Sequence, residues 1–259
     1  MDRKVVFEWF FWVLLSAVIF TAGMSIAVAA PLLVLLAPAP LMLLSGRQDL
    51  RRSACGAVFG SALVFATLGA MPAVMYFVMF GLLGVMFGAA AKFARTGGDF
   101  IIAAMTASII TKVALLAVFT RLAGVNPFMI TPEAATGMMD SLSAAFQAGG
   151  MSVSREAFQT YAKEVVETVK LLMPAMIVLF GAADTFVCYA VATKLLPKMG
   201  SQPPAALPPF GTWRFPRNIF WALLAAIVVD LAGKMRPDLY FFRMLSANLM
   251  EVLRAVFLV

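Results

Sequence analysis

The sequence contains no histidine, only two cysteines, and few charged residues: Asp, Glu, Lys and Arg make up 13% of its 259 positions. Without histidine the chain cannot build a His-ligated zinc site, a Cys–His pair or a Ser-His-Asp triad. The glycine patterns of nucleotide-binding loops are absent, and no loop carries an acidic cluster of the kind that holds a metal. We therefore expect no catalytic residue, cofactor or metal site, and we do not expect an enzyme.

What the sequence has in excess is apolar side chains, at 63% of all residues, with a mean hydropathy of +0.94. Soluble domains contain about 45–50% apolar and about 25% charged residues. One core cannot bury this surplus, so lipid must solvate much of the surface. The net charge of +7 would suggest nucleic acid for a soluble protein. Here the Lys and Arg residues lie mostly in short loops, so we expect no nucleic-acid partner.

The hydropathy predicts an all-α, polytopic transmembrane bundle of about eight spans, forming a single integral membrane domain over residues 1–259. The second span is short and is broken by Pro38 and Pro40. The eighth is still apolar at Val259, so we expect the chain to be truncated at its C-terminus. The predicted spans are 5–29, 32–45, 54–70, 72–91, 100–120, 171–193, 218–233 and 240–259.

Two connecting segments differ from the short loops. Residues 122–169 predict amphipathic helices in an external segment, because apolar residues recur there at helical spacing with polar residues between them. Residues 195–217 form a Pro-rich loop, expected on the cytoplasmic side. Lys and Arg are more numerous on the side that also holds the N-terminus, so the N-terminus is predicted to be cytoplasmic.

Polar residues inside predicted spans are the candidates for function, because a charge at a helix centre costs about 2.5–3.5 kcal/mol on insertion. Four of these polar residues are ionisable: Lys112, Asp184, Asp230 and Glu251. At a rise of about 1.5 Å per residue, they fall within about one helical turn of the same depth in the membrane. Three interpretations stay open: a polar cavity that binds a solute or moves ions; structural pairing of Lys112 with Asp184 or Asp230 and of Arg254 with Glu251; or exposure of these groups to lipid. The predicted site comprises Lys112, Asp184, Asp230, Asn248 and Glu251.

Small residues recur at helical spacing in the N-terminal half. Gly56 with Gly60 and Gly84 with Gly88 form GxxxG pairs, which allow helix backbones to approach closely. Such rows serve internal packing or dock a partner membrane protein. Trp213 with Arg214 is either an interfacial anchor or a cytoplasmic docking point. The predicted docking residues are a row of small residues at every fourth position of the first span, Ala17, Thr21, Ser25 and Ala29, together with Trp213 and Arg214.

Three segments carry a family resemblance: PAPLMLLSGRQDLR at 38–51, residues 174–200, and LPPFGTWRFPR at 207–217. They resemble the YybS-like family of predicted bacterial membrane proteins, which has no assigned function. That family is distantly similar to the S subunits of energy-coupling-factor vitamin transporters and to small scaffold proteins of the rod cell-shape system. The likeness to S subunits implies solute binding from outside and docking to an energising partner, although S subunits usually have six spans.

We therefore expect a multi-pass protein of the bacterial cytoplasmic (inner) membrane that binds a small solute and is transporter-like. The solute would lie between the external helices and the mid-depth polar residues. The alternative is a non-catalytic scaffold that organises partner proteins. The expected partners are the lipid bilayer, a small-molecule solute, and either another membrane protein or a second copy of the chain.

Overall fold

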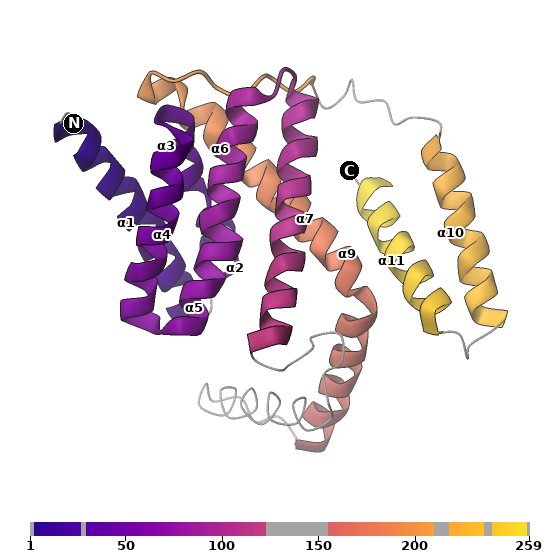
Figure 1. The fold of residues 1–259 in the computed structure, drawn as a ribbon. Coiled ribbons are helices and arrows are strands. Elements are labelled where there is room, and N and C mark those ends of the chain that lie inside the picture. The colour runs from indigo at the N-terminus through magenta and orange to yellow at the C-terminus, as the bar shows by residue number, and fades with distance from the viewer. Residues whose placement is uncertain (1–2, 27–29, 123–154, 210–217, 236–239, 258–259) are drawn as a thin grey trace. The chain divides into compact units, whose positions relative to one another are not determined.

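A computed structural model describes residues 3–26, 30–122, 155–209, 218–235 and 240–257, which are helical apart from short connections and contain no strand within these ranges (Figure 1). The chain forms two compact units. The first comprises Met1–Leu115 and Phe180–Arg214, and the second comprises Leu116–Leu179 and Phe215–Val259. Two long helices, α7 (Gly97–Leu122) and α9 (Arg155–Leu195), contribute residues to both units.

The first unit contains most of the helices. They are α1 (Arg3–Ser25), α2 (Ala30–Leu36), α3 (Ala39–Arg47), α4 (Leu50–Leu68), α5 (Ala70–Met75), the π-helix η1 (Tyr76–Leu82), α6 (Leu83–Phe93), most of α7, the C-terminal part of α9, and the short 3₁₀ turn η2 (Pro197–Met199). The second unit contains the end of α7, the first part of α9, α10 (Asn218–Met235) and α11 (Tyr240–Phe257), with α10 packed against α11.

The predicted all-α membrane fold is confirmed in the described ranges, whereas the count of eight spans is not. Within the described ranges, four helical stretches are long and apolar enough to cross a membrane, and 32–47 is a shorter apolar one. Residues of the third, seventh and eighth predicted spans are also helical, in α4, α10 and α11. The four candidate spans are Arg3–Ser25, Ala70–Phe93, Gly97–Leu122 and Glu167–Met199.

The structure refines the connections between predicted spans. The second span is broken as predicted: α2 ends at Leu36 and α3 begins at Ala39, on either side of a turn that contains Pro38. In contrast, the predicted amphipathic helix that starts near Ser154 continues into the sixth span as the single helix α9, with Pro174 inside it. Residues 123–154 of the predicted external segment and 210–217 of the Pro-rich loop lie outside the described residues.

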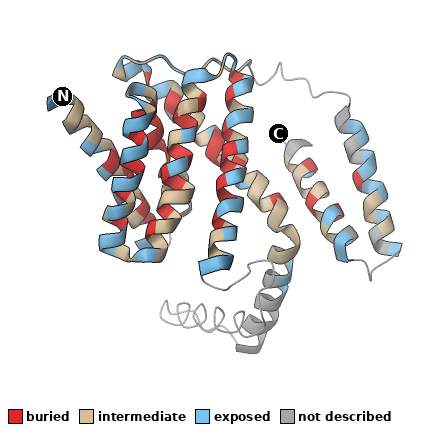
Figure 2. Ribbon diagram, viewed as in Figure 1, coloured by how far each residue is buried: buried red, intermediate tan, exposed pale blue. Residues whose placement is uncertain are grey.

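Two hydrophobic clusters form the core of the first unit. One joins α3, α6, α7 and α9 around Phe87 and Phe100, and the other joins α1, α4 and η1 around Phe20 and Tyr76. Helix α3 is almost wholly buried, whereas α1 and α7 alternate buried and exposed faces (Figure 2). Large apolar side chains are exposed on these helices, Phe7 at 75% and Ile102 at 69%, as expected where lipid is the solvent.

The predicted glycine pairs pack helices together inside this unit. A Cβ on Gly84 would lie 2.7 Å from the carbonyl oxygen of Pro38 and 2.8 Å from Cβ of Leu41, and a Cβ on Gly88 would overlap Ser45. A Cβ on Gly56 would lie 2.8 Å from Val13. The glycines therefore let α4 and α6 approach their neighbours at distances that a side chain would prevent.

Candidate functional site

A buried ion pair joins α7 and α9 in the first unit. Lys112 lies about 15 residues after the start of α7, roughly 22 Å along the helix axis, and Asp184 lies about 11 residues before the end of α9, roughly 17 Å from it. Both helices contain candidate membrane spans, and a hydrocarbon core is about 30 Å thick. The pair therefore belongs to the interior of the spans and not to their ends.

Three polar groups form a closed hydrogen-bonded cluster at this position. The Lys112 ammonium donates to Oδ2 of Asp184 and to Oγ of Ser108, the latter at 2.6 Å. The Ser108 hydroxyl in turn donates to Oδ2 of Asp184 at 2.8 Å. The side chains of Lys112 and Asp184 are each 10% exposed. Ser108 thus contacts both charges, and the cluster as a whole is formally neutral.

The helix faces around the pair explain why these side chains meet. At Gly181, an added Cβ would be in ordinary contact with Ile109 at 3.4 Å and with Ser108 at 3.7 Å, so α9 lies directly against α7 there. Asp184 follows Gly181 by one turn, and Lys112 follows Ser108 by one turn. The small residue and the hydroxyl therefore bring the two backbones close enough for the charges of the next turn to pair.

The neighbouring hydroxyl groups bond their own helices. Thr111 Oγ1 donates to the carbonyl of Ser108 at 3.0 Å, and Thr185 Oγ1 donates to the carbonyl of Gly181 at 2.8 Å. Cys188, one turn beyond Asp184, is fully buried.

The ion pair keeps hydrogen-bonding capacity on both partners, because Asp184 has further lone pairs and Lys112 has a third N–H. A proton or cation that reached the cluster would meet the Asp184 carboxylate, and an anionic group would meet the Lys112 ammonium. In the described ranges, no three metal-ligating side chains gather at one place.

The other predicted site residues lie in the second unit. Glu251 pairs with Arg254 of its own helix at 3.5 Å, with side chains 40% and 68% exposed, which is the local pairing that the sequence left open. Asp230 lies partly exposed on α10. The structure therefore brings Lys112 and Asp184 together, and the depth shared by all the predicted site residues stays a prediction.

Asn248 is buried and acts on α9. Its Oδ1 accepts a hydrogen bond from the backbone N–H of Ala175 at 2.6 Å, and its Nδ2 donates to the carbonyl of Leu171 at 2.6 Å. Leu171 and Ala175 are the carbonyl and amide that one turn of α-helix would pair with each other. Pro174, one of the three residues between them, lacks an N–H and disturbs the helix ladder. Asn248 therefore joins α11 to α9 at the proline.

The predicted docking residues divide between buried and exposed positions. Ala17 is 5% exposed and belongs to the α1–α4–η1 cluster. Thr21 is partly exposed, and Ser25 is exposed with its Oγ donating to the Thr21 carbonyl at 2.9 Å. Residues 29, 213 and 214 lie outside the described residues. The α1 row therefore takes part in internal packing at Ala17, and docking through the other positions stays a prediction.

Sequence reasoning missed Ser108 as part of the cluster. The signal was present, because Ser108 precedes Lys112 by four residues and so lies on the same face of α7. The choice of Asp184 over Asp230 as the partner of Lys112 had no comparable signal, since each acid lies on another helix.

Comparison with known proteins agrees with this architecture. The family of predicted membrane proteins DUF2232 matches residues 14–259, so the chain belongs to this family and is an integral membrane protein of unknown function. No curated protein and no solved structure matches the chain.

Proposed function

We propose that this DUF2232 protein is a transporter-like, non-catalytic membrane protein that binds a small charged solute or an ion at the Lys112–Asp184 pair. The observation that supports it is the burial of a Lys and an Asp from two candidate membrane helices, both bonded to Ser108. We further propose a location in the bacterial inner membrane with a cytoplasmic N-terminus, and a kinship to YybS-like proteins and transporter S subunits.

A buried ion pair contributes little net stability to a helical bundle. Taking two charges out of water costs several kcal/mol each, and replacing a buried ion pair by apolar residues is often neutral or stabilising. A bundle that required only stability would gain as much from two leucines at 112 and 184. An ionisable pair inside the membrane is therefore best interpreted as a site at which charge is exchanged.

Exchange at this pair has two chemical forms. A proton or cation that binds the Asp184 carboxylate releases Lys112, and an anionic group of a solute that binds the Lys112 ammonium releases Asp184. In both cases Ser108 is able to remain bonded, as a donor to a carboxylate or as an acceptor from an ammonium. The solute class is therefore a small molecule or ion that carries at least one charge.

The test is to identify what co-purifies with the protein from native membranes. We compare the wild-type chain with the charge-swapped variant, in which Lys112→Asp and Asp184→Lys are combined, and extract bound small molecules for mass spectrometry. The swap keeps a pair and so should keep most of the thermal stability, while it reverses the polarity that a solute meets. We expect a charged molecule on the wild type and its loss from the swap.

Glu8→Gln is the matched control, because it neutralises one member of the Arg47–Glu8 ion pair, which lies outside the predicted site, and it should leave the bound molecule in place. Equal occupancy of the wild type and the swap, or no bound molecule on either, would show that the pair is structural.

A second candidate function is a membrane scaffold that organises partner proteins. The observation that favours it is the close packing at Gly84 and Gly88, where α6 lies against α3 without room for a side chain. A scaffold should retain its protein partners when Lys112→Met and Asp184→Leu remove the charges. Crosslinking in native membranes followed by affinity purification measures this: partners that stay on the double variant support the scaffold, and the absence of specific partners on the wild type contradicts it.

A further inference from the structure

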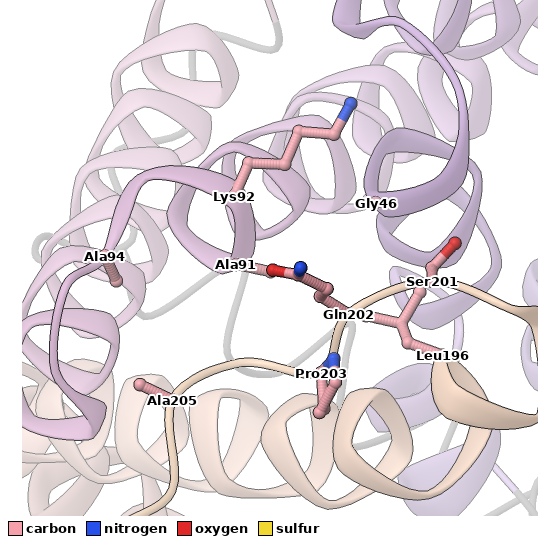
Figure 3. Close-up of a pocket in the computed structure, with 9 residues that line it drawn as sticks. All are labelled: Gly46, Ala91, Lys92, Ala94, Leu196, Ser201, Gln202, Pro203 and Ala205. Atoms are coloured by element: carbon pink, nitrogen blue, oxygen red, sulfur yellow. The ribbon is translucent and has the colours of Figure 1, made fainter.

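A pocket opens in the first unit where α3, α6 and α9 end (Figure 3). Its volume is about 480 Å³, within the range of small-molecule sites. The loop residues after η2 form one side of it, and the end of α6 with residue 94 forms another. Among the residues that the structure describes, Lys92 is the one titratable group in its lining. The lining consists of Gly46, Ala91, Lys92, Ala94, Leu196, Ser201, Gln202, Pro203 and Ala205.

The loop wall of the pocket is held in place by α9 and α7. The Tyr189 hydroxyl donates to the carbonyl of Ala205 at 3.1 Å and accepts from the backbone N–H of Leu207 at 2.8 Å. On the other side, a Cβ on Gly97 would lie 2.8 Å from the carbonyl oxygen of Ala206. The loop therefore packs directly on the first residue of α7, and the pocket is formed before any ligand arrives.

The surroundings of the pocket are basic. Lys194, Lys198 and Arg95 lie on or next to the elements that line it, and none has an ion-pair partner among the residues that the structure describes. Arg47 at the end of α3 is paired with Glu8 at 2.8 Å. The Lys92 ammonium donates to the backbone carbonyl of Gln48, which leaves its charge uncompensated and two of its N–H groups available.

Helix dipoles do not account for these charges. The C-terminus of a helix carries roughly −0.5 of an elementary charge, so the ends of α3, α6 and α9 together contribute about −1.5. The cations without a carboxylate partner are Lys92, Arg95, Lys194 and Lys198, and the same connections hold two carboxylates, Asp49 and Asp99, so the formal sum of these side chains is +2. The N-termini of α4 and α7 add about +1, so the total remains positive by roughly 1.5 charges. The pocket therefore keeps a positive potential and favours an anion.

The depth of the pocket points to the source of that anion. One candidate span ends at Phe93 and the next begins at Gly97, so residues 91–94 lie where the helices leave the hydrocarbon. Phospholipid phosphates lie at this level, and basic pockets between membrane helices bind anionic headgroups. We propose that the pocket binds the phosphate of an anionic phospholipid, with Lys92 as its charged contact and Ser201 and Gln202 as hydrogen-bonding groups. This inference does not rest on the proposed function.

Native mass spectrometry of the full-length protein in detergent tests it. The probes are phosphatidylglycerol, phosphatidylcholine of the same chain length, and glycerol 3-phosphate. We expect one saturable phosphatidylglycerol site that phosphatidylcholine fills at least ~10-fold more weakly, and a loss of about tenfold in affinity for Lys92→Gln. Ala205→Leu, which fills the pocket without changing its charge, should weaken binding similarly.

Arg121→Gln is the control, since it removes one exposed positive charge at the other end of α7. Circular dichroism and size-exclusion chromatography verify that each variant is folded. Equal binding by Lys92→Gln and Arg121→Gln, with Ala205→Leu unchanged, overturns the proposal. Tight binding of glycerol 3-phosphate with no preference among the lipids supports the phosphate site and assigns it to a soluble phosphate ester.

Discussion

The side-chain oxygen of Asn248 accepts a hydrogen bond from the backbone N–H of Ala175, the residue that follows the proline within α9. The amide nitrogen of the same side chain donates to Leu171 and to Met244, each at 2.6 Å. One carboxamide thus serves two helices, α9 and α11, and meets the backbone groups of α9 at the place where Pro174 interrupts its ladder.

Substitution of this side chain should weaken the second unit. Asn248→Leu leaves the N–H of Ala175 and the carbonyl of Leu171 without the amide, so we expect a loss of about 1–3 kcal/mol in the free energy of unfolding. Denaturation of the purified protein in mixed micelles measures it. Ser246→Ala is the control, because Ser246 is also buried on α11, and among the described residues its hydroxyl bonds the carbonyl of Arg243 in its own helix and no group of α9.

The loss of unfolding free energy in Asn248→Leu should depend on Pro174. In a Pro174→Ala background the N–H and carbonyl groups of α9 are able to pair with one another, so Asn248→Leu should cost less there than in the wild-type chain. A double-mutant cycle gives the coupling free energy. If the cost of Asn248→Leu were identical in both backgrounds, the link between Asn248 and Pro174 would be wrong.

Removal of one charge of the buried Lys112–Asp184 pair should lower the stability of the protein more than removal of both charges. Lys112→Met leaves Asp184 buried without its partner, which costs about 3–5 kcal/mol. The double variant with Asp184→Leu should recover most of that loss, because no uncompensated charge remains. The measurement is thermal unfolding in detergent. The exposed pair of Glu251 and Arg254 supplies the comparison, since its neutralisation should change stability by less than about 1 kcal/mol.

Helix packing at Gly84 offers a test of the first unit. Gly84→Ala places a Cβ 2.7 Å from the backbone carbonyl oxygen of Pro38, the residue before α3. A backbone atom cannot move as a flexible side chain would, so we expect a loss of about 1–3 kcal/mol in the free energy of unfolding. The matched control is Gly98→Ala in α7, where only Thr96 Oγ1 lies near the new Cβ, at 3.6 Å. Its helix propensity should leave stability unchanged or higher by up to about 1 kcal/mol. Equal destabilisation of the two variants would contradict the close packing of α3 and α6.

The Tyr189 hydroxyl should determine how firmly the pocket loop is held. Tyr189→Phe removes the group that bonds Ala205 and Leu207, and each such bond contributes about 0.5–1.5 kcal/mol. We expect amide hydrogen exchange at Leu207 to become up to ~10-fold faster, while α7 keeps its protection. Tyr240→Phe, at an exposed position at the start of α11, should not change the exchange of the loop. Unchanged exchange at Leu207 in Tyr189→Phe would argue against this anchor.

Local patterns were sufficient for much of the fold. The hydropathy predicted the helical, membrane-embedded class, and Pro38 predicted the break between α2 and α3 because a proline ends the helix that precedes it. The same rule did not apply at Pro174. There α9 continues through the proline, and the amide of Asn248, far along the chain, bonds the affected turn. A local rule cannot include a partner that is distant in sequence.

The candidate site also combines features that local sequence predicts with features that depend on contacts between distant segments. The cost of a charge in lipid is a property of the residue and its hydrophobic neighbours, so Lys112 and Asp184 were identifiable from their positions within apolar runs. Their pairing with each other depends on which faces of α7 and α9 meet, and that is set by packing at Ser108 and Gly181. Asp230 was an equal alternative in the sequence because helix periodicity defines a face but not its neighbour.

Composition and periodicity thus predicted that lipid surrounds this protein, where its helices lie, and which buried charges require an explanation. Each of these properties depends on short stretches of chain. The partner of Lys112, the role of Asn248 at Pro174, and the basic pocket at Lys92 depend on contacts between segments tens of residues apart. Such contacts follow from side-chain packing between helices, which no single stretch of sequence contains.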